Sequence, residues 1–266
     1  MLNKLTNYAW MTLLVLIAYP YNTSFAQVDT LTAGQIWKEP VTGMEFVWVP
    51  KGCYEMGCGS WADECEKDEK PAHEVCLDGF WMAKTEVTQG QWKQVMGNNP
   101  AKFQKGDNYP VENIYLDETK KFAKKLSALN NGAYQFRLPT EAEWEYACRS
   151  GGKQEKYAGG AEVDKVAWHL GNSGRSTHPV ATKAPNGIGL YDMSGNVSER
   201  VEDHYFAFAY RKHERNNPVY KKGEPYRSYR GGHWTRTPDF CRCLQRWYDT
   251  IPYRGSSVGF RLVRNQ

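Results

Sequence analysis

The 266-residue sequence lacks several features that mark particular classes of protein. It has no internal repeat, no low-complexity segment and no clear linker, which favours a single domain. It has no dense run of lysine and arginine, although its formal net charge is +4, so nucleic acid is not expected as a partner. After residue 26 it has no apolar run long enough to span a bilayer. We therefore expect a soluble mature domain without a stable membrane anchor.

The first 26 residues have the pattern of a secretory signal peptide. Lys4 gives a positive start, residues 9–18 are apolar, and Ser24-Phe25-Ala26 is a small-x-small cleavage motif. The apolar run is short for a transmembrane helix, and no cysteine follows the motif to carry a lipid. We expect a signal peptide over residues 1–26, a lead-in over 27–40 and one exported domain over 41–266, either periplasmic or secreted.

The composition favours a loop-rich fold held together by aromatic side chains. Aromatic residues make up 14% of the chain, beside 24 glycines and 13 prolines, which is unlike a helical bundle. Charge is uneven: residues 50–80 carry a net −5, and residues 211–266 a net +9. The basic segment fits either an anionic partner or structural arginines that are buried or stacked. We favour the second, because these arginines are spaced singly among aromatic residues.

Local patterns predict a mixed α+β domain with little regular secondary structure. Strands are expected at 46–50, 53–57, 73–77 and 80–82, helices at 89–96, 117–129 and from 141, and a late strand pair between 228–234 and 258–263. Thr88 and Thr140 are expected N-caps, Thr140 in a capping box with Glu143. In the second helix Phe122, Leu126 and Leu129 share one face.

All seven cysteines lie beyond the signal peptide. They are Cys53, Cys58, Cys65, Cys76, Cys148, Cys241 and Cys243. The first four, with His73, offer enough ligands for zinc, but their spacing matches no zinc knuckle or finger. In an exported chain disulfides are favoured. Cys53 paired with Cys76 around a nested Cys58–Cys65 is our preferred arrangement of the three possible ones. The odd count leaves one thiol free or paired between chains.

Five segments, in order, resemble the sulfatase-modifying-factor, or formylglycine-generating-enzyme-like, family. They are residues 84–92, 136–151, 185–197, 230–232 and 259–263. The resemblance covers nearly all of residues 41–264 and implies a fold related to C-type lectins. The family includes the oxidase that converts a sulfatase cysteine into formylglycine with copper on two cysteines and dioxygen. It also includes sulfoxide synthases, enzymes of siderophore pigment maturation, and binding domains without known activity, so membership alone does not define function.

The resemblance implies a calcium site at Asp192, Gly195, Val197 and Glu199. Two carboxylates and two backbone carbonyls at a tight turn suit a hard cation. The alternative is that both carboxylates stabilise the turn without a metal. The family's aromatic residues on either side of the glutamate are replaced by Ser198 and Arg200, and Arg200 then has Glu199 or Asp203 as a possible partner. A second calcium site of the family falls within 164–179, where no carboxylate pair is evident.

The resemblance also locates the copper cysteines after Gly231-Gly232. The second position is Cys241, but the first is Arg236, and His233 replaces the family's usual serine. Arginine is not a metal ligand, so copper is not expected. A copper site from Cys241 and Cys243 has only its ligand type in its favour. The family pattern further implies a disulfide from Cys148 to Cys241 or Cys243, with His233 near the remaining thiol.

The resemblance therefore leads to two functional hypotheses. The preferred one is an exported formylglycine-generating-enzyme-like protein without a complete copper site, which binds an unidentified protein, peptide or small molecule or has an undefined activity. The rival is an oxidoreductase that modifies an exported protein or secondary metabolite, with Cys241 and His233 as its candidate catalytic residues and Cys243 as a further residue of the site. Calcium is the expected metal under either hypothesis.

Overall fold

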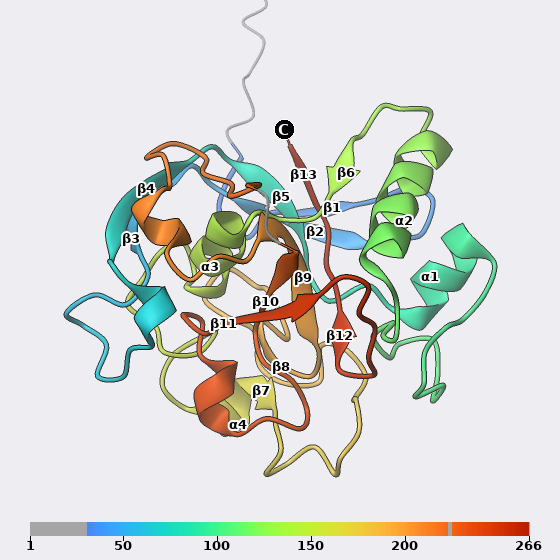
Figure 1. The fold of residues 1–266 in the computed structure, drawn as a ribbon. Helices are drawn as coiled ribbons and strands as arrows, with labels where there is room; N and C mark the ends of the chain where they lie inside the picture. The colour runs from blue at the N-terminus through green and yellow to red at the C-terminus, as the bar shows by residue number, and fades with distance from the viewer. Residues whose placement is uncertain (1–30, 223–224, 266) are drawn as a thin grey trace, which may run out of the picture. The chain divides into compact units, whose positions relative to one another are not determined.

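The computed structural model describes residues 31–222 and 225–265, which form one compact unit (Figure 1). The expected signal peptide lies outside these residues. Within them, no helix combines the length and the apolar character that crossing a membrane requires. Helices and strands are mixed and many connections are long loops, so the α+β prediction is confirmed.

The larger sheet has five antiparallel strands in the order β1-β2-β5-β13-β6. Their bounds are β1 (Ile36–Lys38), β2 (Glu45–Val49), β5 (Phe80–Ala83), β13 (Val263–Asn265) and β6 (Phe136–Arg137). β1 comes from the expected lead-in and pairs along β2, so the folded unit begins before residue 41. β13 lies between β5 and β6, two strands that are far from it in sequence.

The side chains of the larger sheet divide the apolar core into two clusters. Along β2, Phe46 and Trp48 belong to one cluster, whereas Val47 and Val49 belong to the other. β5 alternates in the same way. This two-residue period is what a strand with apolar neighbours on both faces requires. The sheet therefore separates two packed layers and has no solvent-facing side over these strands.

Helices pack into both of these core clusters. They are α1 (Gln89–Met96), α2 (Leu116–Leu129), α3 (Glu141–Cys148) and α4 (Val163–Val166), with 3₁₀ turns η1 (Lys67–Glu69), η2 (Ala209–Arg211) and η3 (Pro238–Cys241). Both predicted N-caps form: Thr88 accepts from the N–H of Gln91, and Thr140 from that of Glu143. In α2, Phe122 and Leu126 are buried, but Leu129 is 49% exposed. Leu129 was wrongly assigned to the packing face, because the helix ends there.

The smaller sheet has the order β11-β10-β9-β12. Its strands are β9 (Ser198–His204), β10 (Tyr226–Arg230), β11 (Arg246–Thr250) and β12 (Val258–Gly259). The predicted pairing of 228–234 with 258–263 is wrong, because β9 lies between β10 and β12. β9 escaped notice because Val201 is its only aliphatic residue, so no apolar alternation marks it.

Two short ribbons complete the fold. β3 (Gly52–Met56) pairs with β4 (His73–Leu77), and β7 (Ala167–Trp168) with β8 (Ser194–Gly195). Cys53 and Cys76 occupy opposite positions on β3 and β4 and form a disulfide, and a second disulfide joins Cys58 to Cys65. These four cysteines are therefore consumed, which removes the thiolate ligands that the alternative zinc site needs.

Candidate functional site

The Gly231-Gly232 turn needs glycine at both positions. Both glycines have positive φ angles, 91° and 68°, a region that other residues rarely adopt. A Cβ atom on Gly232 would lie 2.3 Å from the carbonyl oxygen of Phe240 and 2.9 Å from the Cys241 sulfur. The turn therefore packs directly on the cysteine at the family's second copper position.

Cys241 is the one free cysteine in the part of the chain that the structure describes, and it is buried. It ends η3 and packs with Tyr157, Val166 and Ala167. Burial raises the pKa of its thiol to about 12. A thiol with this pKa is almost entirely protonated near neutral pH, and the thiolate is the form that attacks substrates and binds metals.

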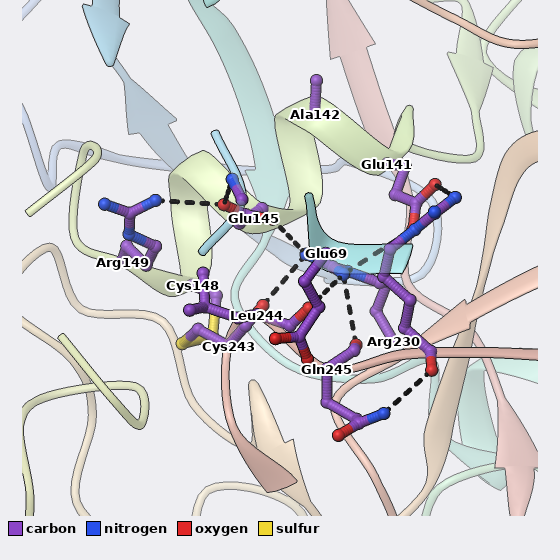
Figure 2. A network of polar contacts seen from close by, with 12 residues as sticks. Glu69, Glu141, Ala142, Glu145, Cys148, Arg149, Arg230, Cys243, Leu244 and Gln245 are labelled. Carbon is purple, nitrogen blue, oxygen red and sulfur yellow. Dashed lines mark hydrogen bonds and ion pairs between the residues drawn. A yellow bond between two sulfur atoms is a disulfide. The ribbon is translucent and has the colours of Figure 1, made fainter. Parts of the chain in front are cut away.

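Cys243 is not available as a second ligand. It forms a disulfide with Cys148, the last residue of α3, across 95 residues of sequence. Figure 2 shows this disulfide beside α3, with Leu244 and Gln245 following it. Of the two partners that the resemblance left open for Cys148, the structure selects Cys243.

Arg236 occupies the family's first copper position, and its guanidinium packs against two aromatic rings. The guanidinium carbon lies 5.1 Å from the ring centroid of Phe240 and 4.6 Å from that of Trp247. The hollow that these residues line with His233 has a volume of only about 10 Å³. A water molecule needs roughly 10–15 Å³, so the hollow admits a larger ligand only if the side chains that line it move.

His233 lines the same hollow but is not arranged as a base for Cys241. Its Nδ1 lies 3.0 Å from Oγ1 of Thr235 and accepts from the Thr235 backbone N–H at 3.3 Å. Burial and the Arg236 guanidinium lower the pKa of His233 to about 4, so the imidazole is neutral near pH 7. Among the described residues, no hydrogen bond links this imidazole to the Cys241 sulfur.

Beside the hollow, a buried network of charges ties α3 to the C-terminal third of the chain. Glu145 accepts from Arg149 Nη1 at 3.0 Å and from Arg230 Nη2 at 2.5 Å. Glu141 forms a two-point ion pair with Arg246, at 2.8 and 3.0 Å. Figure 2 shows Glu141, Glu145, Arg149 and Arg230 of this network beside α3. The two-point geometry and the paired carboxylates are what keep these buried charges tolerable, although Arg230 Nε itself has no hydrogen-bond partner in residues 31–222 and 225–265.

Sequence reasoning identified the apolar residues of α3 and Glu143 of its capping box, but missed the buried carboxylates Glu141 and Glu145. All eight residues of the helix are buried, including Glu141 and Glu145. The available signal was the i, i+4 spacing of Glu145 and Arg149 within a segment too apolar for a surface helix. The arginines themselves follow the favoured interpretation: Arg230, Arg242, Arg246 and Arg261 are all buried and paired with glutamates.

The expected calcium ligands lie in and beside the turn that leads into β9. Asp192 is buried and accepts the Ala181 N–H at 2.7 Å through Oδ2. Both oxygens of Glu199 are held by Arg261, at 2.6 and 2.7 Å, and Oε2 also accepts from the indole of Trp144. The backbone of Gly195 and Val197 completes the expected set.

Glu86, which the sequence analysis did not select, lies among these groups. Its two oxygens accept the Val197 N–H at 3.0 Å and the Asn196 side-chain amide at 2.7 Å. Burial, followed by the charges of Asp192 and Glu199, raises the pKa of Glu86, and burial raises that of Asp192 to about 6. Three buried carboxylates thus share one guanidinium, and the excess negative charge calls for protons or a cation.

Arg200 does not take either partner suggested from the sequence. Its guanidinium donates to the Tyr229 hydroxyl at 3.0 Å and to the carbonyls of Ile114 and Tyr253. Asp203 instead accepts the backbone N–H groups of Glu141 and Tyr220. The suggested pairing of Arg200 with a neighbouring acid is wrong, because the side chain points across the sheet toward the 114 and 253 loops.

Comparisons with known proteins agree with this architecture. Residues 32–266 match the model of the sulfatase-modifying factor enzyme 1-like domain. The chain is 31% identical over 205 residues to the chaperone protein LppX of Paenibacillus barcinonensis, which covers 58% of this chain and 70% of that protein. It is 25% identical to the formylglycine-generating enzyme of Mus musculus, covering 89% of this chain and 78% of the mouse protein.

Among solved structures, PvdO from Pseudomonas aeruginosa superposes with a TM-score of 0.78 at 25% identity, covering 89% of this chain and all of that one. Against the serine/threonine-protein kinase pkn1 of Chlamydia caviae, the chain spans 38% of the relative's length. Activities of such longer relatives do not transfer from this match.

Proposed function

Because the chain belongs to the sulfatase-modifying factor enzyme 1-like family, we propose that it is an exported member that works as an accessory or binding protein. In this proposal the chain has no copper-dependent oxidase activity. Its ligand is an exported protein, a peptide or a small molecule. No nucleic acid and no membrane anchor are involved.

The main support for this proposal comes from the residues that occupy the family's two copper positions. Arg236 stands at the first and is stacked on Phe240 and Trp247. Cys241 stands at the second as a buried thiol whose pKa burial raises to about 12. Cys243 is in a disulfide with Cys148. A two-thiolate copper site therefore does not fit the residues present.

The surface around the hollow supports a binding role. Trp247 and Tyr248 of β11 are 40% and 43% exposed, and large exposed aromatic side chains are typical anchors of binding surfaces. Arg236 has aromatic contacts but, within the described ranges, no carboxylate partner. A ligand that carries a carboxylate next to an apolar group complements this arrangement. The chaperone description of the relative LppX agrees with an accessory role.

Copper titration of the purified protein tests the proposal. We expect no tight Cu(I) binding in competition with a chromogenic chelator. The variant Arg236→Cys supplies the missing thiol and is the matched positive control. Stoichiometric, tight Cu(I) binding by the unmodified protein would contradict the proposal and favour the rival oxidoreductase. That rival has Cys241 and His233 as its candidate catalytic residues, and a Cys241→Ser variant that loses dioxygen-dependent turnover of an exported substrate would support it.

Export is tested separately. Expression with the native N-terminus is expected to yield a processed protein outside the cytoplasm that begins at Gln27. Protein that stays in the cytoplasm with residues 1–26 attached contradicts this part of the proposal. The disulfides Cys53–Cys76, Cys58–Cys65 and Cys148–Cys243 support it, because disulfides persist in oxidising compartments.

Calcium at Asp192, Gly195, Val197 and Glu199 remains part of the proposal. The excess of buried carboxylates over Arg261 supports a cation there. Asp192→Asn is the suitable variant, because Asp192 has a positive φ of 57° that asparagine tolerates. Calcium is expected to raise the melting temperature of the parent protein and to have a smaller effect on this variant. Equal melting temperatures with calcium and with chelator would exclude the site.

A further inference from the structure

A pocket separate from the Gly231-Gly232 turn lies between the loop closed by Cys58–Cys65 and the 154–161 segment. It has a volume of about 200 Å³ and is lined by Trp61, Asp63, Gln154 and the buried Leu244, among others. Pockets for drug-sized ligands have roughly 300–1,000 Å³. The space therefore suits a single small ring.

The aromatic wall of this pocket is held in position. The guanidinium carbon of Arg149 lies 4.5 Å from the ring centroid of Trp61. Arg149 is itself fixed by Glu145 at 3.0 Å and by the Glu55 carbonyl at 2.7 Å. The Cys58–Cys65 disulfide ties both ends of the loop that carries Trp61. A wall fixed in this way binds a ligand with little loss of side-chain freedom.

The charges of the pocket disfavour an anionic ligand. Arg242 lines it, but the guanidinium already donates to both oxygens of Glu69, at 2.8 and 3.2 Å, and to the Glu64 carbonyl. Lys156 lies 3.4 Å from a carboxylate oxygen of Glu64. Asp63 adds a further negative charge. Phosphate or carboxylate groups would meet a neutralised arginine and an excess of acid.

The polar side chains that line the pocket offer both acceptors and donors to a ligand. The indole N–H of Trp61 is buried and has no acceptor. In the described part of the chain, no hydrogen bond or ion pair engages the Asp63 carboxylate or the Gln154 amide. An ammonium group offers donors alone, so it pairs with the Asp63 carboxylate but not with the N–H groups of the Gln154 amide. A hydroxyl group offers both a donor and an acceptor.

We propose that this pocket binds one hexopyranose ring, as a free sugar or as the terminal residue of a glycan. The C–H face of the ring packs on Trp61 and Leu244, and the hydroxyl groups bond to Asp63 and Gln154. This site is independent of the hollow at Arg236 and does not rest on the accessory function.

Saturation-transfer NMR with methyl glycosides of glucose, galactose, mannose and N-acetylglucosamine tests the proposal on the purified protein. We expect at least one glycoside to bind at millimolar concentration. Gln154→Ala and Asp63→Asn are exposed-residue variants that should fold, and each is expected to weaken binding about tenfold, the loss of one to two hydrogen bonds. Trp61→Ala should abolish it.

Two controls separate this site from other sugar contacts. Trp247→Phe removes an exposed tryptophan outside the pocket, and Glu214→Gln removes an exposed acid; both should bind as the parent does. A peptide carrying the same hexose as its terminal glycan residue distinguishes the sources: tighter binding than the methyl glycoside identifies a glycan, and equal binding a free sugar. The absence of binding by all four glycosides overturns the proposal. So does binding that survives Trp61→Ala, or preferential binding of methylammonium.

Discussion

Arg230 Nη2 lies 2.5 Å from Oε2 of Glu145, and neither side chain reaches solvent. Glu145 also accepts from Arg149 and from the Gly57 N–H at 2.8 Å. Three segments that are far apart in sequence thus meet at one carboxylate: the turn after β3, α3 with the residue that follows it, and β10. Glu145 therefore links α3 both to an early turn and to a late strand of the domain.

Glu145→Gln is expected to destabilise the protein by about 3–5 kcal/mol, because it leaves buried guanidinium groups without a counter-charge. Chemical denaturation measures the change in the free energy of unfolding. The surface pair Arg215–Glu74, with side chains about 60% exposed, is the control, and Arg215→Gln should cost less than about 1 kcal/mol. If Glu145→Gln lowers the free energy of unfolding no more than Arg215→Gln does, the charges of the buried network do not stabilise the protein.

Thiol labelling should distinguish the native from the unfolded state. We expect no reaction of the native protein with an aromatic disulfide reagent, because Cys241 is buried and burial raises its pKa to about 12. After unfolding without reductant, a single thiol should react. A native protein that labels rapidly would mean that Cys241 is reachable and reactive.

The disulfides should differ in the stability that they provide. By the chain-entropy model, the Cys148–Cys243 bridge, with a separation of 95 residues, contributes about 4–5 kcal/mol, and Cys58–Cys65, with a separation of 7, about 2 kcal/mol. Paired cysteine-to-alanine variants, unfolded by urea, test this order. Equal losses for the two double variants would contradict the loop-entropy account.

Glu112 should make the stability of the protein depend on pH. It is fully buried, Oε1 accepts the Phe103 N–H at 2.7 Å, and Oε2 has no partner. Burial raises its pKa to about 7. The folded state therefore binds this proton more tightly than the unfolded chain does, and the associated stability is present below pH 4.5 and is lost as the pH rises through 7.

Glu112→Gln removes this ionisable group, so the stability of the variant should depend less on pH. Melting temperatures of parent and variant are compared between pH 5 and pH 8. As the pH rises over this range, the melting temperature of the variant should increase relative to that of the parent. Parallel curves for the two proteins would show that Glu112 does not titrate in this range.

Gly232→Ala should be much more damaging than Gly97→Ala. Both glycines have positive φ, but a Cβ at Gly97 meets nothing within 4 Å, whereas at Gly232 it meets the Phe240 carbonyl. Gly97→Ala should cost about 1 kcal/mol for the backbone conformation alone. A similar loss of stability for Gly232→Ala would mean that the loop before Cys241 shifts easily and that the shape of the hollow changes with it.

The helices and their caps could be predicted because their determinants are local. Thr88 and Thr140 each lie three residues before the group they bond, so the motif is complete within one turn of sequence. The resemblance to the family was likewise carried by contiguous segments, and it gave the fold correctly.

The parts that could not be predicted depend on contacts between distant residues. β9 is mostly polar, so nothing local marks it as the strand between β10 and β12. The pairing of Cys148 required knowing which of Cys241 and Cys243 faces α3. The sequence identified Arg236 as the replaced ligand, but the stacking on Trp247 that closes the hollow appears only when β11 is placed beside η3.

Because β13 is an inner strand, the larger sheet is complete only when the end of the chain has been synthesised. β5 and β6 are both complete once residue 137 has been made, yet they are joined only through residues 263–265. Until those residues emerge, the larger sheet stays open and exposes the unpaired edges of β5 and β6, which invite pairing with other chains.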